Sequence, residues 1–198
     1  MWWKSKDKAQ FERVRKAVAG MSRYDRAEDW LSSIIDAFGT DERVADRTLE
    51  NLRHWVFGLD GSEYVRVGDE WDVYLDFWRR MTERFPAQPR LRRLHAETLL
   101  MMDRISESME EFLSALEADP HVGFPGDLNE FMQGDPRWWR DYRLLLLRGA
   151  LERNDDGDED DYIQELLAEL KHDYRDEPAT LARIQEQLDR AGWTSRNA

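Results

Sequence analysis

The chain has 198 residues, of which 41% are hydrophobic and 36% charged; it is long enough to bury a core, and its composition is that of a folded, helix-rich protein. Its formal net charge of −13 repels phosphate backbones and argues against nucleic acid as a partner. There are no cysteines, no signal-peptide core and no apolar run of about 20 residues, so disulfides and thiolate chemistry are excluded and a cytoplasmic location is expected.

Apolar residues recur every three or four positions along the N-terminal half, which is the spacing of amphipathic helices. Gly20 and Gly39 follow the first two stripes as helix stops, and Pro86 closes the fourth. Gly58 to Gly61 indicates a tight turn, and the alternating stretch Glu63 to Val67 is expected to be loop, because one short segment has nothing obvious to pair with. The predicted helices of this half cover residues 11–18, 27–38, 44–56 and 71–85.

The C-terminal half continues the helical pattern after one interruption. Residues 121–135 hold three glycines and one proline, which predicts a loop with a single helical turn at 128–132. Asp135 is expected to cap a helix that has Pro136 in its first turn; this helix is apolar nearly all round and is therefore expected to be central and buried. The predicted helices of this half cover residues 91–102, 105–116, 136–151, 162–170 and 181–191.

A repeat-like unit lies between Pro86 and Pro120, which are 34 residues apart and each close an amphipathic helix. The unit carries small residues at Ala96, Ser108 and Ala115 and larger apolar residues at Leu99 and Phe112. In these residues the segment 87–120 resembles a tetratricopeptide repeat. The resemblance implies that the small residues stand where two antiparallel helices approach closely.

The resemblance implies an all-α fold in which antiparallel helix pairs stack as a short, irregular α-solenoid. Residues 68–86 and 22–34 look like the second helices of degenerate units, although bulky Tyr74 replaces a residue that is usually small. Since each such unit buries its face against neighbours, and since no Gly/Ser-rich linker divides the chain, we expect one domain over 1–198 with about eight helices.

The candidate partner-binding residues follow from the same resemblance, because the first helix of each tetratricopeptide unit lines a concave groove. That helix would present Arg90, Arg93, Glu97, Leu100 and Met101 to the groove. An arginine pair in this position is suited to hold a carboxylate of a partner segment bidentately.

Two further features bear on this site. Residues 79–93 contain six arginines and a single acidic residue, Glu83, which gives a local net charge of +5. The alternative to partner binding is a basic rim that the protein's own acidic loop neutralises. Trp138 is a further candidate: adjacent residues point about 100° apart on a helix, so Trp138 and Trp139 are both buried only if neighbours surround that turn.

Other chemistry finds little support in the sequence. The acidic run 152–161 places oxygen ligands around Gly157 in the manner of a calcium loop, but Ile163 stands where the closing glutamate belongs, so a solvated acidic turn is expected. The four histidines, His54, His95, His121 and His172, form no zinc motif. Without a nucleophile elbow or a glycine-rich phosphate loop, we expect no metal, no cofactor and no enzymatic activity.

The N-terminus offers the only hint of a membrane surface. Trp2 and Trp3 stand with lysines and arginines around an apolar stripe, as in interfacial helices, but this narrow stripe would equally dock onto the next helix, so membrane contact is not expected. The sequence thus predicts a non-enzymatic protein–protein interaction module, an adaptor or chaperone-like protein that binds a partner peptide or helix. The alternative is an acidic inhibitor, immunity or antitoxin-type protein that covers a basic partner surface.

Overall fold

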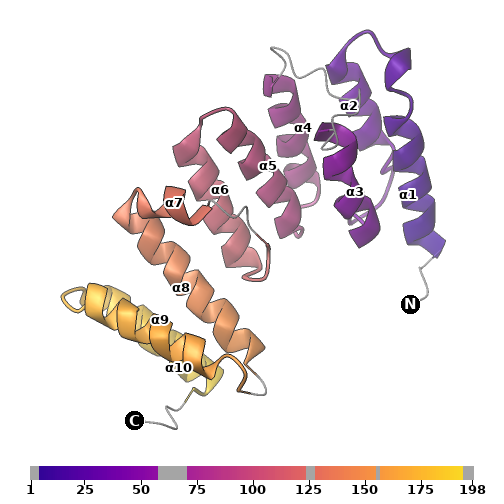
Figure 1. Cartoon of the computed structure of the whole chain (residues 1–198). Coiled ribbons are helices and arrows are strands. Elements are labelled where there is room, and N and C mark those ends of the chain that lie inside the picture. Colours follow the sequence, from indigo (N-terminus) through magenta and orange to yellow (C-terminus); the bar gives the residue numbers. More distant parts are fainter. Residues whose placement is uncertain (1–4, 58–70, 124–127, 155–156, 194–198) are drawn as a thin grey trace. The chain divides into compact units, whose positions relative to one another are not determined.

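The structure of the protein is a computed structural model that describes residues 5–57, 71–123, 128–154 and 157–193. Within these ranges the chain is all-helical, with ten α-helices, one short 3-10 helix and no strand, which confirms the predicted all-α class (Figure 1). Ten is more than the predicted number of about eight, and α7, six residues long, lies where the sequence predicts only a single helical turn. The predicted turn at Gly58–Gly61 and loop at Glu63–Val67 lie outside the described residues.

The chain forms two compact units, Met1–Phe112 and Leu113–Ala198, and the prediction of a single domain over 1–198 stays a prediction. The first unit holds α1 (Ser5–Val18), η1 (Met21–Arg23), α2 (Ala27–Asp36), α3 (Asp46–Phe57), α4 (Trp71–Arg84), α5 (Pro89–Met101) and the start of α6 (Ile105–Ala118). The second unit holds the end of α6, α7 (Leu128–Gln133), α8 (Pro136–Arg153), α9 (Asp160–Asp173) and α10 (Pro178–Ala191).

In the first unit α2 and α4 run parallel. Arg80 Nη1 donates to Ser32 Oγ over 3.0 Å, and Arg84 Nη1 donates to the Ile35 carbonyl over 3.1 Å. The partners in these two bonds are 48 and 49 residues apart, and so nearly constant an offset requires parallel helices. Arg84 also donates to the Gly39 carbonyl, so its guanidinium binds both the last turn of α2 and the turn that follows it.

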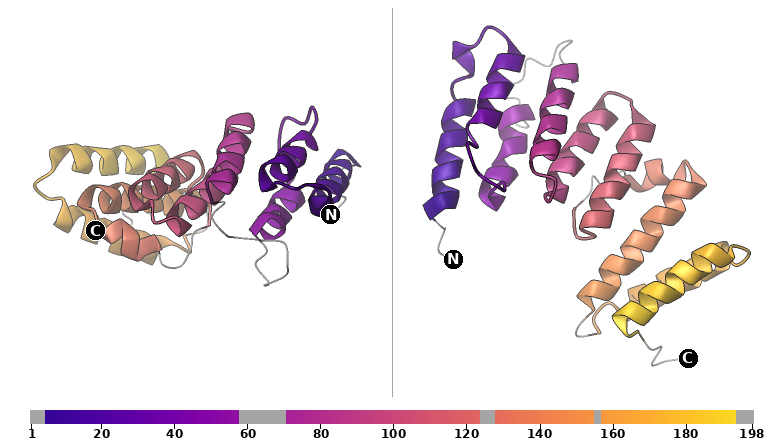
Figure 2. Two further views of the ribbon diagram at one scale, coloured as in Figure 1. Left: turned by 90° about the horizontal axis from the view of Figure 1, so that it is seen from above. Right: turned by 180° about the vertical axis from the view of Figure 1, so that it is seen from behind.

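A second parallel pair is formed by α3 and α5. Gln88 Nε2, just before α5, donates to the Val44 carbonyl, just before α3, over 3.1 Å. Further along the same helices Arg53 pairs with Glu97, and the offset of 44 residues is the same. The first unit therefore has one row with α2 beside α4 and another with α3 beside α5, and α1 contacts both α2 and α3 (Figure 2).

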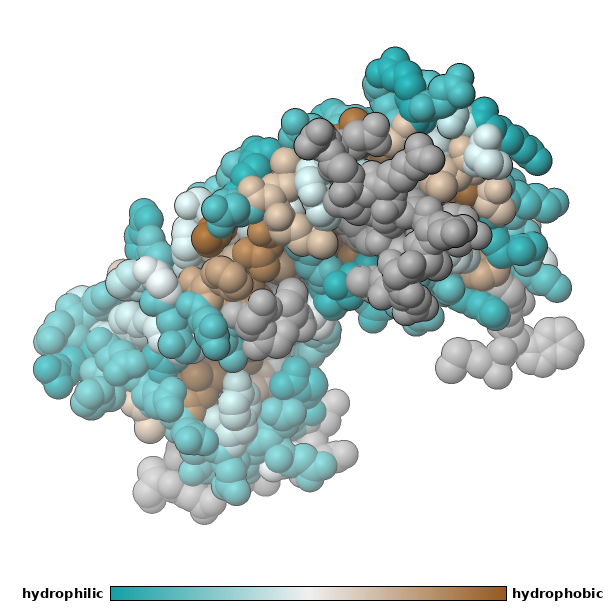
Figure 3. All heavy atoms as spheres, turned by 45° about the horizontal axis from the view of Figure 1, so that its top comes forward, coloured by the Kyte–Doolittle hydropathy of each residue, from teal (hydrophilic) through white to brown (hydrophobic). Residues whose placement is uncertain are grey.

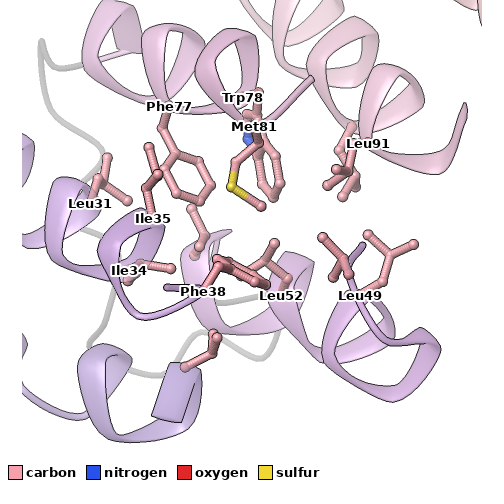
Figure 4. Packing of buried hydrophobic residues seen from close by; sticks show 14 of the residues in the cluster. Leu31, Ile34, Ile35, Phe38, Leu49, Leu52, Phe77, Trp78, Met81 and Leu91 are labelled. Carbon is pink, nitrogen blue, oxygen red and sulfur yellow. The ribbon is translucent and has the colours of Figure 1, made fainter. Parts of the chain in front are cut away.

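The core of the first unit fills the space between these rows. Figure 4 shows Ile34 and Phe38 from α2 and its following turn, Leu52 from α3, and Trp78 and Met81 from α4 pointing toward one another. Burying a side chain of this size contributes about 1.5–3 kcal/mol relative to leaving it in water. The residues buried here belong to the periodic apolar stripes of the sequence. Their burial stabilises the helices that these stripes predict.

Two of the tryptophans lie in this core. Trp30 and Trp78 are 1% and 0% exposed, whereas Trp55 and Trp71 are half-buried. Trp30 also donates its indole N–H to the Val18 carbonyl over 3.2 Å. This bond satisfies a buried donor and ties α2 to the end of α1.

The apolar stripe of α1 is covered rather than exposed. Phe11, Val14 and Val18 are all buried, so this stripe docks on neighbouring helices. On the same buried face of α1, Gln10 Nε2 donates to the Arg43 carbonyl over 2.7 Å while Gln10 Oε1 accepts from the Ala45 backbone N–H over 2.7 Å. Trp2 and Trp3 lie outside the described residues.

The predicted hairpin at 87–120 is present in the first unit as α5 followed by the start of α6. Ala96 and Ser108 are both 0% exposed, and the Ser108 hydroxyl donates to the Ala96 carbonyl over 2.8 Å. Arg92 Nε lies 3.9 Å from Glu111 Oε2, so residues later in α6 meet residues earlier in α5, as antiparallel helices require. Both residues of the hydrogen bond, Ala96 and Ser108, are small, as the resemblance implies.

In the second unit α8 is the central helix, as predicted. It contacts α7, α9 and α10, and none of its residues from Trp138 to Leu151 is exposed. Asp135 caps it: Asp135 Oδ1 accepts a hydrogen bond from the Arg137 backbone N–H over 2.7 Å, with Pro136 in the first turn.

A buried arginine joins α8 to α9. Arg143 is 2% exposed and pairs with Glu169 at 2.9 Å and with Asp173 at 2.7 Å, while its guanidinium lies 5.4 Å from the centre of the Trp139 ring. The hydrogen bond from Arg143, and a weaker one with His172, lower the pKa of Asp173. Two carboxylates thus compensate one buried cation, which is the condition under which such burial is tolerated.

Candidate functional site

The predicted site residues of α5 form one stripe along the helix. Arg90, Arg93, Glu97 and Met101 follow each other at spacings of three and four residues, which places them on one face. The core-facing side of α5 carries Leu91, Leu94 and Leu99 instead. Five of the six predicted site residues therefore belong to one helix, and four of them to one line along it, with Leu100 beside its end.

Glu97 is the centre of this stripe and is only 6% exposed. Its Oε1 atom accepts a hydrogen bond from Arg93 Nε over 2.7 Å, and its Oε2 atom forms an ion pair with Arg53 Nε of α3 at 3.0 Å. Arg53 and Arg93 keep 41% and 24% of their side-chain surface exposed. The three residues, here the Arg53–Glu97–Arg93 cluster, join α3 to α5 and carry a formal charge of +1.

Each arginine of this cluster uses its Nε atom to reach Glu97. Within the part of the chain that the structure describes, the Nη1 and Nη2 atoms of Arg53 and Arg93 form no hydrogen bond. Arg90, exposed at the start of α5, has no hydrogen bond or ion pair with any described residue. The face thus offers guanidinium N–H groups that remain available to an anion.

An apolar end adjoins these cations. Met101 is 60% exposed, more than Tyr162 at 42% or Tyr24 at 39%, the other large hydrophobic side chains exposed in the described ranges. Leu100 beside it is half-buried. Figure 3 shows one face of the molecule, on which hydrophilic side chains prevail and hydrophobic ones gather in a few places.

Trp138 belongs to a different compact unit from the other five predicted site residues. It lies in the second unit, in the first turn of α8, where it is half-buried. Its neighbour Trp139 packs against Tyr142, with ring centres 6.0 Å apart, and under Arg143. Trp138 and Trp139 share one turn of α8, and both are half-buried.

The rest of the arginine cluster at 79–93 contacts the protein itself. Arg79 pairs with Asp76 and Glu83 along α4, Arg80 and Arg84 reach α2, and Arg92 lies near Glu111. Their partners are acidic neighbours, a hydroxyl and backbone carbonyls. The uneven charge in the sequence thus reflects internal pairing for most of these arginines and leaves Arg90 and Arg93 on the candidate face.

The acidic run 152–161 is also engaged by its own surroundings. Arg153 pairs with Glu159 at 3.1 Å, and Asn154 Nδ2 donates to Asp160 Oδ1 over 2.7 Å. Asp155 and Asp156 lie outside the described residues. Among the residues that are described, no three side chains of metal-ligand type are placed to hold an ion.

Arg53 is the residue that sequence reasoning missed. Its helix was predicted, but its partner lies 44 residues away, and only the parallel packing of α3 on α5 brings the two together. No local spacing signals such a pair. Knowledge of the register between the two helices would have been needed.

Comparison with known proteins does not assign the chain. No protein-family model matches it, and neither a curated protein nor a solved structure is significantly similar to it. Over the described ranges, none of the helices combines the length and the apolar character that crossing a bilayer would require.

Proposed function

We propose that the protein is a non-enzymatic interaction module, an adaptor or chaperone-like protein, and that it binds a partner peptide or helix on the face that α3 and α5 form. The observation that carries this proposal is the Arg53–Glu97–Arg93 cluster. A buried carboxylate holds two arginines by their Nε atoms, and their terminal N–H groups stay available beside the exposed side chain of Met101.

The two arginines compensate the burial of Glu97, as two carboxylates compensate that of Arg143. The support for binding therefore comes from what stays uncovered beside the cluster, the terminal N–H groups of the arginines and the side chain of Met101. An exposed methionine gains nothing in the free protein. Both features become favourable when a partner covers them, because the ion pairs then strengthen and the apolar surface leaves water.

The parallel rows of the first unit support the same proposal. In tetratricopeptide proteins the first helices of successive units stand side by side and line the groove. We infer that α1, α3 and α5 play this part here, in a short and irregular tetratricopeptide-like α-solenoid. The hairpin of α5 and α6, with its small residues at the contact, is the unit on which this inference rests.

The test is affinity capture from the native host followed by mass spectrometry. The double variant Arg90→Glu with Arg93→Glu reverses charge on the face, and Arg175→Glu with Arg190→Glu, at exposed arginines of the second unit, makes the same change elsewhere. We expect wild type and the second variant to capture the same proteins in the same amounts. The first variant should capture at least tenfold less of them, while its circular dichroism is unchanged.

Met101→Glu is the matched variant that leaves both arginines in place. It should also lose the captured proteins, because it puts a charge where apolar contact is expected. Capture that is equal for all variants, or no protein held above background, would contradict the proposed function.

A further inference from the structure

We propose that the face of α3 and α5 recognises a side-chain carboxylate, an aspartate or glutamate inside a partner segment, that is followed by an apolar residue. This inference rests on the proposed function and names the chemistry of the partner. The juxtaposition that carries it is one buried carboxylate between two arginines of different helices, with an exposed methionine one helical turn away.

The first step concerns the geometry of the two guanidinium groups. Arg93 occupies Oε1 of Glu97 and Arg53 occupies Oε2, so the two groups lie at opposite oxygens of one fixed carboxylate. A guanidinium that is held by Nε presents its Nη edge away from that carboxylate. Two such edges supply parallel N–H donors, which match the two oxygens of a second carboxylate.

The second step concerns charge. The Arg53–Glu97–Arg93 cluster has a formal charge of +1, and Arg90 one turn earlier raises the face to +2, while the whole chain carries −13. So small an excess suits one or two carboxylates. A polyanion such as nucleic acid would be repelled by the rest of the molecule.

The third step concerns what lies beside the anion. Met101 follows Glu97 by four residues, about 6 Å along the helix axis. A free anion would leave this side chain uncovered, whereas a peptide with an apolar residue after its acid would cover it. The occupant is therefore a protein segment and not a free carboxylate or phosphate.

Glu97 is a positioning residue in this arrangement. Its negative charge opposes an acidic ligand. Its two oxygens, however, hold both arginines in place, so that the arginine side chains lose less entropy when the ligand binds. Glu97→Gln separates the two effects. If only net charge mattered, this variant would bind an acidic peptide more tightly; if positioning matters, it binds more weakly.

The experiment uses the full-length protein and a random 12-residue peptide library displayed inside a loop, so that no free carboxyl terminus is present. We expect enrichment of aspartate or glutamate followed within four residues by leucine, isoleucine, methionine or phenylalanine. The most enriched sequence is then synthesised with both ends blocked, and its dissociation constant is measured by fluorescence anisotropy.

Single variants locate the binding. Arg53→Gln and Arg93→Gln should each weaken binding tenfold or more, since each removes charge-assisted hydrogen bonds. Arg79→Gln is the matched control, because Arg79 is exposed on α4 and paired with Asp76 and Glu83. It should leave the dissociation constant unchanged, and Glu97→Gln should raise it.

The outcomes distinguish this inference from the proposed function. Enriched peptides without an acidic residue, an unaffected Arg53→Gln, tighter binding by Glu97→Gln, or a requirement for a free carboxyl terminus or a phosphate would each overturn the inference and leave the interaction module standing. A library with no enriched peptide overturns recognition of a linear segment. If capture from the host also fails, the proposed function falls with it.

Discussion

The turn between α5 and α6 places one residue in an unfavourable backbone conformation. Asp103 has φ +59°, in the left-handed region that favours glycine. The turn needs this conformation because the Asp103 N–H donates to the Leu100 carbonyl and the Arg104 N–H donates to the Leu99 carbonyl, which together close the end of α5. Asp103 itself is exposed, so its side chain is not required for packing.

Asp103→Gly should therefore stabilise the first unit. The gain from relieved backbone strain exceeds the entropy that glycine adds to the unfolded chain, and we expect about 0.5–1 kcal/mol in urea unfolding. Gly39→Ala is the mirror experiment: Gly39 has φ +57° and open space around its Cα, so alanine should destabilise by about 1 kcal/mol through the backbone alone. Destabilisation by Asp103→Gly together with stabilisation by Gly39→Ala, or no effect at either position, would show that neither turn is strained.

The sequence did not predict which residues pair between different helices. Gly39 and Asp135 act as the end signals that local chemistry predicts, because a helix end depends on the few residues around it. Arg53 on Glu97 depends on how two helices pack, 44 residues apart, and no local rule encodes that distance. Four of the six predicted site residues lie on one line of α5 because helical spacing is local, whereas Trp138 lies in the other unit.

At the scale of elements, α8 shows how one cap controls a buried helix. Hydrogen bonds from the Arg137 side chain and backbone lower the pKa of Asp135 to about 2. The same carboxyl in the unfolded chain titrates near 3.9. A pKa that is lower in the folded protein means that the ionised cap stabilises the fold above about pH 4, and that this stabilisation is lost as the pH falls toward 2.

Asp135→Asn tests this cap, because asparagine still accepts the Arg137 N–H but does not titrate. We expect the stability of wild type to fall more steeply than that of the variant between pH 5 and pH 3 in matched urea titrations. The carboxyl carbon of Asp135, followed by NMR, should titrate near pH 2. A pKa of Asp135 close to 4, with parallel stability curves for wild type and variant, would mean that the hydrogen bonds from Arg137 do not stabilise the ionised carboxylate.

At the scale of the whole molecule, the two compact units have no counterpart in the composition of the sequence. No linker composition separates two domains, so the sequence predicts one. The boundary between the two compact units falls after Phe112, inside α6, where helical periodicity is uninterrupted. Compactness depends on contacts between distant residues, so a boundary inside a continuous helix leaves no compositional trace.

The two hydrophobic clusters share no residue: one spans Val14 to Leu94, the other Leu144 to Leu188. Leu147 is fully buried in the second cluster and Leu52 in the first. Replacing either by alanine should cost about 2–5 kcal/mol, because the deleted methyl groups leave a cavity. If each cluster stabilises its own unit, each substitution should weaken the helices of that unit alone.

Native-state hydrogen exchange on the full chain measures this directly. Leu147→Ala should lower the protection of core amides in α8, α9 and α10 by roughly thirtyfold or more and leave those in α2 and α4 unchanged. Leu52→Ala should produce the reverse pattern. Loss of protection throughout the chain in both variants would show that the 198 residues unfold as one cooperative domain, as the sequence predicts, and that the two clusters are parts of a single core.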